Sequence, residues 1–424
     1  MKKLNETNLF RALRSRNFVL YFIGRAVSQF GTWMQRTAVI WVVYTITHSA
    51  FWIGVTIFAE QFPSFLFSFW GGVAADRYDR FRVIQVTQAT SIVQAVLLAV
   101  LVLTGHTAVW AILVLSVILG VINAFDVPAR QSLFNEIIAD PADLSNALSL
   151  STATASLAQL LGPALSGIIL ASFGAATCFF INALSFVAVM VSLWLMDRPF
   201  YQPKSSHKKV TRDFAEGFAY IWKTPSIGLV ILMLSIVSLL VLPYNTVLPV
   251  FAKVIFKGDA KTFGYVTSVI SAGAVAGTIF LASRKPGTHM RRILFVSTIV
   301  MGIGMIFFSQ FKYFPLAMFF AAVTGFGSIA QFTVCNIVVQ SESAPQMRGR
   351  AIGILLMAIF GMMPLGSVIV GAVSERIGAP ATVLAEGILA ICIALAFVKF
   401  LTKNTAGSAV TDASLEEPGD PKTY

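Results

Sequence analysis

The stretch FVLYFIGRAVSQFGTWMQRTAVIWVVYTIT, Phe18–Thr47, is the first long apolar segment of this chain. Its length and apolar character predict a membrane-spanning helix, because about 20 apolar residues at about 1.5 Å each cross the roughly 30 Å hydrocarbon core. The stretch nevertheless contains two arginines, Arg25 and Arg36. Gln29 and Thr32 lie between them at helical spacing, so the four side chains form one polar stripe along the helix.

The two arginines of this stripe need shelter from lipid. A guanidinium at the centre of the hydrocarbon costs about 2.5–3.5 kcal/mol on insertion scales. Two of them on one face are tolerated where that face meets water, a counter-charge or protein. Two interpretations stay open: a structural ion pair inside a helix bundle, and a polar pathway through the membrane.

Composition extends this interpretation to the whole chain. The 424 residues are 57% hydrophobic and 12% charged, whereas soluble domains are about 25% charged. We therefore expect an all-α membrane protein. The net charge of +12 is carried in short loops between apolar segments, which is typical of membrane topology and not of nucleic-acid binding. The three cysteines all lie in apolar segments, so we expect no metal site and no cofactor.

Twelve apolar segments are each long enough to cross a bilayer. They are Phe18–Thr47, Phe51–Ala75, Val83–Leu103, Ala108–Val127, Leu144–Ser172, Ala175–Met196, Ile227–Phe251, Phe263–Ser283, Ile293–Phe311, Phe314–Val339, Ala351–Val373 and Ala379–Leu401. The longest interruption divides them six and six. This organisation predicts a lead-in over 1–17, a six-helix bundle over 18–196, a linker over 197–225, a second six-helix bundle over 226–402 and a disordered tail over 403–424.

The basic residues predict the orientation. With both termini in the cytoplasm, 24 of the 31 Lys and Arg residues fall on the inner side and five on the outer side. This excess predicts a multi-pass protein of the cell inner (cytoplasmic) membrane with cytoplasmic termini. Within the linker, Phe218, Ile221 and Trp222 recur at helical spacing and predict an amphipathic helix at the membrane surface. A partner-binding helix is the alternative.

The two halves show signs of an internal repeat. Pro141, Gly167 and Gly174 recur as Pro345, Gly371 and Gly378, each 204 residues later. The matches lie in segments of the same order and hydropathy, which favours two copies of a six-helix unit.

An acidic residue in the second segment is a candidate partner for the first. The short connection around His48 predicts an antiparallel hairpin, and Arg36 and Glu60 are both twelve residues from its centre. They should therefore lie at the same membrane depth. An Arg–Glu pair there offsets two costly burials. Two interpretations of this pair stay equally open: a purely structural ion pair, and a protonatable carboxylate whose pairing changes as the protein cycles.

The loop after the second segment carries a recognisable pattern. Gly72-x-x-x-Asp76-Arg77-x-x-Arg80 resembles the cytoplasmic signature of the major facilitator superfamily, although Asp79 stands where a glycine is usual. Three further stretches resemble the branch of enterobactin-exporter-like proteins, which export siderophores and drugs. They are Gly31-Thr32-Trp33-Met34-Gln35-Arg36, Asp126-Val127-Pro128-Ala129-Arg130-Gln131 and Gly162-Pro163-Ala164-Leu165-Ser166-Gly167.

The resemblance implies roles for these residues. It implies a major facilitator fold of twelve transmembrane helices in two six-helix bundles. Gly72, Asp76, Arg77, Arg80 and Asp126 would form a cytoplasmic gate that stabilises the outward-open state, with an Arg80–Asp126 or Arg77–Asp126 pair.

The resemblance also extends to the fifth segment. Gly162 and Pro163, with Gly167, resemble the kinked antiporter motif of that helix, which is associated with export.

Other polar residues of the apolar segments are candidates for a substrate cavity or for hydrogen bonds between helices. They are Gln29, Trp33, Gln61, Tyr244, Asn245, Gln331 and Asn336. Glu386 is a lone acid in the last segment, for which a structural role is as well supported as coupling.

These features predict a secondary transporter that moves a small molecule by alternating access, with proton coupling at Glu60 or Asp126 and contributions from Arg36 and Arg25. We expect a monomer in the lipid bilayer. A lipid or lysolipid flippase on the same fold is the alternative. A membrane-embedded enzyme is more remote, because the four histidines are scattered in loops and form no convergent catalytic set.

Overall fold

The computed structural model of this protein describes residues 8–138, 140–197, 210–284 and 290–402. Every regular element in these residues is a helix. Eleven helical stretches of the described residues are long and apolar enough to cross a membrane, and one of them, Pro225–Ile255, joins several consecutive elements. The 32-residue α1 (Arg16–Thr47) is not one of the eleven, but it packs lengthwise on α5 and α6 inside the first bundle. The tail expected to be disordered, 403–424, lies outside the described residues.

The first bundle is built from the N-terminal half of the chain. A short 3-10 helix, η2 (Asn8–Arg14), precedes α1. The other elements are α2 (Ala50–Arg77), α3 (Arg80–Leu103), α4 (Val109–Ile137), η3 (Pro141–Asp143), α5 (Leu144–Phe173) and α6 (Ala175–Leu195).

The second bundle is built from the C-terminal half. Its amphipathic lead-in is α7 (Val210–Lys223), followed by α8 (Pro225–Leu240). The remaining elements are η4 (Leu242–Val247), α9 (Leu248–Val250), η5 (Phe251–Ile255), α10 (Ala260–Ala282), α11 (Met290–Gln310), α12 (Phe314–Glu342), α13 (Arg348–Ile377), α14 (Ala379–Ala396) and α15 (Val398–Thr402).

The segment Ile227–Phe251 is not the single helix expected. The α-helix ends at Leu240, and a 3-10 turn, a short α-turn and a π-turn follow it. The cause lies in Pro243 and Pro249, because proline lacks a backbone N–H and its ring clashes with the preceding turn. Irregular backbone at membrane depth is tolerated where protein or a cavity surrounds it.

The hairpin of α1 and α2 has explicit end signals. The Ser15 side chain accepts a hydrogen bond from the backbone of Phe18 at the start of α1. At the other end, His48 adopts a left-handed conformation with φ 51°. Ser49 then accepts from the backbone N–H of Trp52 and begins α2. Side-chain caps of this kind satisfy the free N–H groups of a first helical turn, so the chain reverses within two residues.

The two bundles pack tightly at the end where this hairpin lies, which we call the hairpin end. The contacts are made by α2 with α13 and by α5 with α10. A Cβ at Gly371 would lie 2.6 Å from the carbonyl oxygen of Ala50. A Cβ at Gly167 would likewise lie 2.6 Å from the carbonyl oxygen of Ala260. Ser49 also donates a hydrogen bond to Glu375 across this contact. Small residues let the helix backbones approach this closely.

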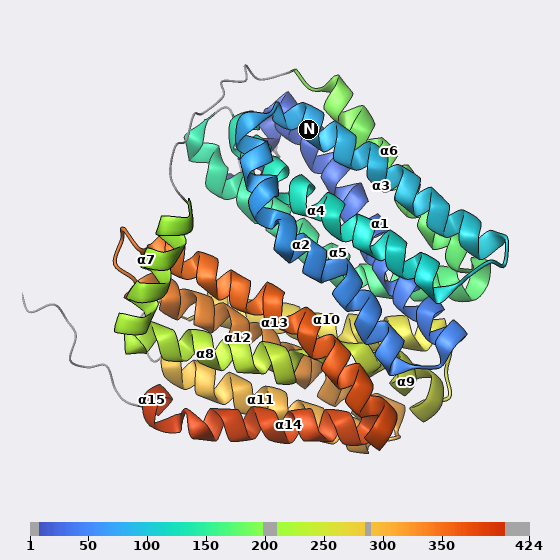
Figure 1. Cartoon of the computed structure of the whole chain (residues 1–424), viewed down its shortest axis with the longest axis vertical. Helices are drawn as coiled ribbons and strands as arrows, with labels where there is room; N and C mark the ends of the chain where they lie inside the picture. The colour runs from blue at the N-terminus through green and yellow to red at the C-terminus, as the bar shows by residue number, and fades with distance from the viewer. Residues whose placement is uncertain (1–7, 139, 198–209, 285–289, 403–424) are drawn as a thin grey trace, which may run out of the picture.

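The bundles diverge toward the opposite end, which we call the terminal end because α7, α15 and the start of the described chain lie there. In Figure 1 the helices meet at the right, near α9 and the α1–α2 turn, and spread apart toward α7 at the left. A Cβ at Gly72 of α2 or at Gly353 of α13 would have no neighbouring atom within 4 Å. The structure therefore shows a conformation that is closed at the hairpin end and open at the terminal end.

Candidate functional site

A cavity of about 340 Å³ lies between the two bundles, and we call it the central cavity. It is bordered by α1, α2 and α5 on one side and by η4, α10, α12 and α13 on the other. Its polar lining consists of Trp33, Arg36, Thr37, Gln61, Gln159, Tyr244, Asn245, Thr246, Thr267, Ser271, Ser328 and Ser367. Arg36 is the one charged side chain among the described residues that line it.

Four of the seven candidate cavity residues line the central cavity, namely Trp33, Gln61, Tyr244 and Asn245. Tyr244 and Asn245 belong to the irregular turn η4, so the proline break places them at the cavity. The other three lie elsewhere: Gln29 is on the polar stripe of α1, Gln331 is completely buried in the second bundle, and Asn336 accepts a 2.5 Å hydrogen bond from Gln340.

Arg36 and Glu60 form an ion pair with 3.5 Å between Nη2 and Oε1. The pairing joins α1 and α2 at the depth that the hairpin symmetry predicted. The guanidinium also lies 5.7 Å from the ring centroid of Trp33, within the range of a cation–π contact. The side chains of Arg36 and Glu60 are 32% and 19% exposed, so water can reach both partners.

A second, smaller cavity of about 120 Å³ lies inside the first bundle, and we call it the inner cavity. Five charged side chains line it: Arg25, Arg36, Glu60, Asp126 and Arg130. Three cations face two carboxylates there, which leaves an excess of one positive charge when all are ionised. Because Arg36 lines both cavities, it connects the inner cavity to the central one. Arg25 and Glu60 are therefore sheltered mainly within one bundle and not in the cleft between the two.

Asp126 has a different partner from the one that the resemblance implied. Its carboxylate is paired with Arg130, one turn further along α4, and accepts hydrogen bonds from Thr87 (2.7 Å) and Gln88 (3.0 Å) of α3. Asp126 and Arg130 are 6% and 5% exposed. The expectation that Asp126 pairs with Arg77 or Arg80 is therefore wrong, because this face of α4 turns into the bundle.

Arg80 forms its ion pair with Glu136 in the last turn of α4 and donates to the carbonyl of Ala75 at 3.1 Å. It lies at the start of α3, where the antiparallel end of α4 is its neighbour. Arg77 is the last residue of α2 and, like Asp76, is exposed. Four of the predicted gate residues, Gly72, Asp76, Arg77 and Arg80, thus lie at the terminal end, where the bundles stand apart, whereas Asp126 lies inside the first bundle.

The motif in α5 lies within a continuous helix that contains Pro163. A Cβ at Gly162 would lie 2.6 Å from the Cβ of Trp33, so this glycine lets α5 approach the cavity wall formed by α1. Gly167 makes the corresponding close contact with α10. The two glycines therefore bring α5 against both bundles.

Sequence reasoning missed a chain of buried amides in the first bundle. Asn182 donates to Gln35 (2.8 Å), and Gln35 donates to Gln94 (3.1 Å). All three line the inner cavity. Their signal in the sequence was an amide within each of three membrane-spanning segments. The role of Arg130 as the partner of Asp126 was also missed, although both residues belong to one of the stretches that carry the family resemblance.

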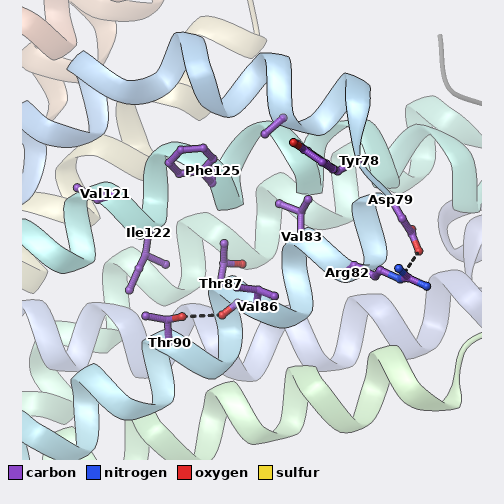
Figure 2. A pocket seen from close by; sticks show the side chains of 11 residues that line it. Tyr78, Asp79, Arg82, Val83, Val86, Thr87, Thr90, Val121, Ile122 and Phe125 are labelled. Atoms are coloured by element: carbon purple, nitrogen blue, oxygen red, sulfur yellow. Dashed lines mark hydrogen bonds and ion pairs between the residues drawn. The ribbon is translucent and has the colours of Figure 1, made fainter.

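A groove of about 520 Å³ on the outside of the first bundle is separate from both cavities. Figure 2 shows it between α2, α3 and α4, with apolar side chains such as Val83, Ile122 and Phe125 along its length and the Asp79–Arg82 ion pair (3.8 Å) at one end. An apolar groove on the outer face of a membrane-spanning bundle suits lipid chains, so we do not assign it to the transport pathway.

The comparisons with known proteins agree with this architecture. A family model described as a transmembrane secretion effector matches residues 7–419. The chain belongs to this family. The match bears out the resemblance to major facilitator exporters.

Among its relatives, the chain is 27% identical to the staphyloferrin A transporter of Staphylococcus aureus, over 89% of this chain and 94% of that protein. It is 24% identical to the multidrug efflux pump Tap of Mycolicibacterium fortuitum, over 81% and 86%. The crystal structure of the nucleoside transporter NupG superposes with a TM-score of 0.71 at 17% identity, covering 94% of this chain and all of that one. The last similarity shows the shared fold alone.

Proposed function

We propose that this protein is a secondary active exporter that moves a siderophore or drug-like small molecule out of the cell in exchange for protons. The central cavity lies between two bundles that close at one end and open at the other, the geometry required for alternating access. The observation that carries the proposal is the Arg36–Glu60 ion pair at the boundary of this cavity.

The orientation follows from the basic residues. The excess of Lys and Arg in the loops of the terminal end supports a cytoplasmic position for that end and a place for the protein in the cytoplasmic membrane. The open terminal end then makes this conformation inward-open, the state that loads an exported substrate. The gate residues Gly72, Asp76, Arg77 and Arg80 would meet the second bundle when the terminal end closes.

Proton coupling requires a carboxylate whose protonation changes the balance between states. A proton on Glu60 removes the charge that holds Arg36, and the guanidinium is then free to find a new partner in the central cavity. Asp126, with Arg25 beside it in the inner cavity, is the second acidic candidate. A ligand or proton shifts a conformational equilibrium only through such a difference in interaction between the two states.

The lining of the central cavity suits an organic molecule with several polar groups. The ring of Trp33 offers stacking, and the amides and hydroxyls from both bundles offer hydrogen bonds at many positions. The names of the relatives, a siderophore transporter and multidrug pumps, point to the same substrate classes. Both bundles of the cavity belong to one chain, so we infer that a monomer in the bilayer is sufficient.

The test is transport by the purified full chain in proteoliposomes with an imposed pH gradient. We would use staphyloferrin A and the dye ethidium as separate probes. The proposal predicts accumulation of at least one probe only in the presence of the gradient, and its loss when a protonophore is added. Equal flux with and without the gradient overturns proton coupling. Movement of a fluorescent lysolipid, with neither probe moved, would identify a flippase.

A further inference from the structure

Glu386 is an acidic side chain in the interior of the second bundle that the proposed coupling does not use. It lies near the middle of α14 and is 3% exposed. Neither carboxylate oxygen has a hydrogen-bond partner among the described residues. Gly387, the next residue, packs directly against Gly302 of α11, so the surrounding helices leave this position little access to lipid or water.

Within the part of the chain that the structure describes, no ion pair joins this carboxyl group to a cation. Of the elements packed against α14, α8 contains no charged or titratable side chain. The charged residues of α11, α13 and α15 lie near the ends of those helices, namely Arg291, Arg292, Arg348, Arg350, Glu375, Arg376 and Lys399. Cys392 of α14 itself is exposed. The remaining element packed against α14 is η4, and Tyr244 is the titratable side chain that it contains.

The predicted internal repeat accounts for the lack of a hydrogen-bond partner among the described residues. Glu386 follows Gly378 by eight residues, as Asn182 follows Gly174, and so stands at the offset of 204 residues that relates the two halves. Asn182 is bonded to Gln35, which is bonded to Gln94. The same offset replaces these two amides by Leu239 and Thr298, and the Thr298 hydroxyl donates to its own helix at Leu294. The acidic group thus occupies an amide position from which the amide partners are missing.

An ionised carboxylate at such a place is far more costly than a neutral carboxyl group, because burying an unpaired charge without hydrogen bonds is strongly unfavourable. We propose that Glu386 is a proton-binding site of the second bundle, protonated in the conformation shown and able to exchange its proton with water in the central cavity past Tyr244. In the release step the carboxyl O–H bond breaks, the proton passes to water and a carboxylate remains.

Two features of Tyr244 suit it to this position. It lines the central cavity and also belongs to η4, the element of this cavity wall that packs against α14. It stands in η4, where the helix is broken between Pro243 and Pro249, so its backbone can move without disrupting a regular helix. Rearrangement of η4 as the bundles rock is then the event that admits water to Glu386. The inference deepens the proposed function, since it rests on proton-coupled transport.

The first test is infrared spectroscopy of the purified full chain at neutral pH, which needs no substrate. The proposal predicts a carbonyl stretching band of a neutral carboxyl group in the wild type, retained in Glu60→Gln and Glu375→Gln but absent in Glu386→Gln. Glu375 is an exposed glutamate and is the matched control. Glu386→Asp should keep the band at a shifted frequency. That shift would assign the band to residue 386 even if Glu386→Gln does not fold. Absence of the band from the wild type, or its persistence in Glu386→Gln, overturns the proposal.

The second test is ethidium transport in proteoliposomes. We expect Glu386→Gln to reduce accumulation driven by the pH gradient while ethidium exchange across the membrane continues. Gradient-driven accumulation equal to that of the wild type would overturn the role of Glu386 and leave the proposed function intact. Wild-type transport that is the same with and without the pH gradient would overturn both the role of Glu386 and the proposed proton coupling.

Discussion

Arg36 of α1 and Glu60 of α2 are joined across the hairpin by a 3.5 Å contact, at the point where the inner cavity meets the central cavity. Replacing Glu60 by Gln removes the charge that pairs with Arg36 and also the proton-binding group. We expect pH-gradient-driven accumulation of the transported probe to fall by about 5- to 150-fold, the range of typical coupling free energies. Exchange without a gradient should continue.

The control for this prediction is the swapped pair Arg36→Glu with Glu60→Arg. It keeps both charges at the same depth and should retain more expression and thermal stability than either single reversal. Unchanged gradient-driven transport in Glu60→Gln would remove Glu60 from the coupling mechanism.

The buried pair of Asp126 and Arg130 should dominate the stability of the first bundle. Asp126→Asn leaves the Arg130 guanidinium buried without its counter-charge, which typically costs about 3–5 kcal/mol. We expect a clearly lower melting temperature of the detergent-solubilised protein. The double change Asp126→Leu with Arg130→Met removes both charges and should recover most of the loss. An Asp126→Asn protein that melts like the wild type would contradict this assignment.

Gly371 should control the balance between the two conformations. Gly371→Ala introduces a Cβ 2.6 Å from the Ala50 carbonyl oxygen, closer than packed atoms allow, so it disfavours closure of the hairpin end. We expect a shift toward the conformation that is closed at the terminal end. Gly349→Ala is the matched control, because a Cβ at Gly349 meets open space.

The shift can be measured by cross-linking Gly72→Cys with Gly353→Cys in a Cys392→Ala background. The two positions lie about two turns beyond the contact of Phe65 with Gly361, on helices that run in opposite directions. Cross-linking yield should rise in Gly371→Ala and stay constant in Gly349→Ala. An equal yield in all three proteins would show that the hairpin-end contact does not set the equilibrium.

Trp33 and Gln331 should separate binding from stability. Trp33 lines the central cavity, so Trp33→Ala should weaken binding of the transported probe, measured by intrinsic fluorescence or calorimetry, by about tenfold or more, as loss of an aromatic anchor does.

Gln331 is completely buried and both of its amide atoms lack partners among the described residues. Gln331→Leu should therefore leave binding unchanged and raise the free energy of unfolding by about 1–3 kcal/mol, the cost of an unsatisfied polar group. Weaker binding in Gln331→Leu would place it in the substrate path.

The local predictions from sequence that succeeded concern single segments or neighbouring pairs. Hydropathy located the helices because each must satisfy its own backbone in lipid. The depth of Arg36 and Glu60 followed from a connection of only two residues, which leaves little freedom in register. The predictions that failed concern helix rotation and interruption. Asp126 turns inward to Arg130, and the prolines of η4 break a segment that is apolar throughout.

A helical membrane protein with charges in its first segment could be predicted from the amino-acid sequence, since length, hydropathy and basic loops are properties of the chain. Which polar groups meet depends on the assembled tertiary structure. The rotation of each helix about its axis depends on packing against several others at once, and no single segment encodes it. For that reason the isolation of Glu386 and the link between the two cavities through Arg36 became visible only when the bundles were assembled.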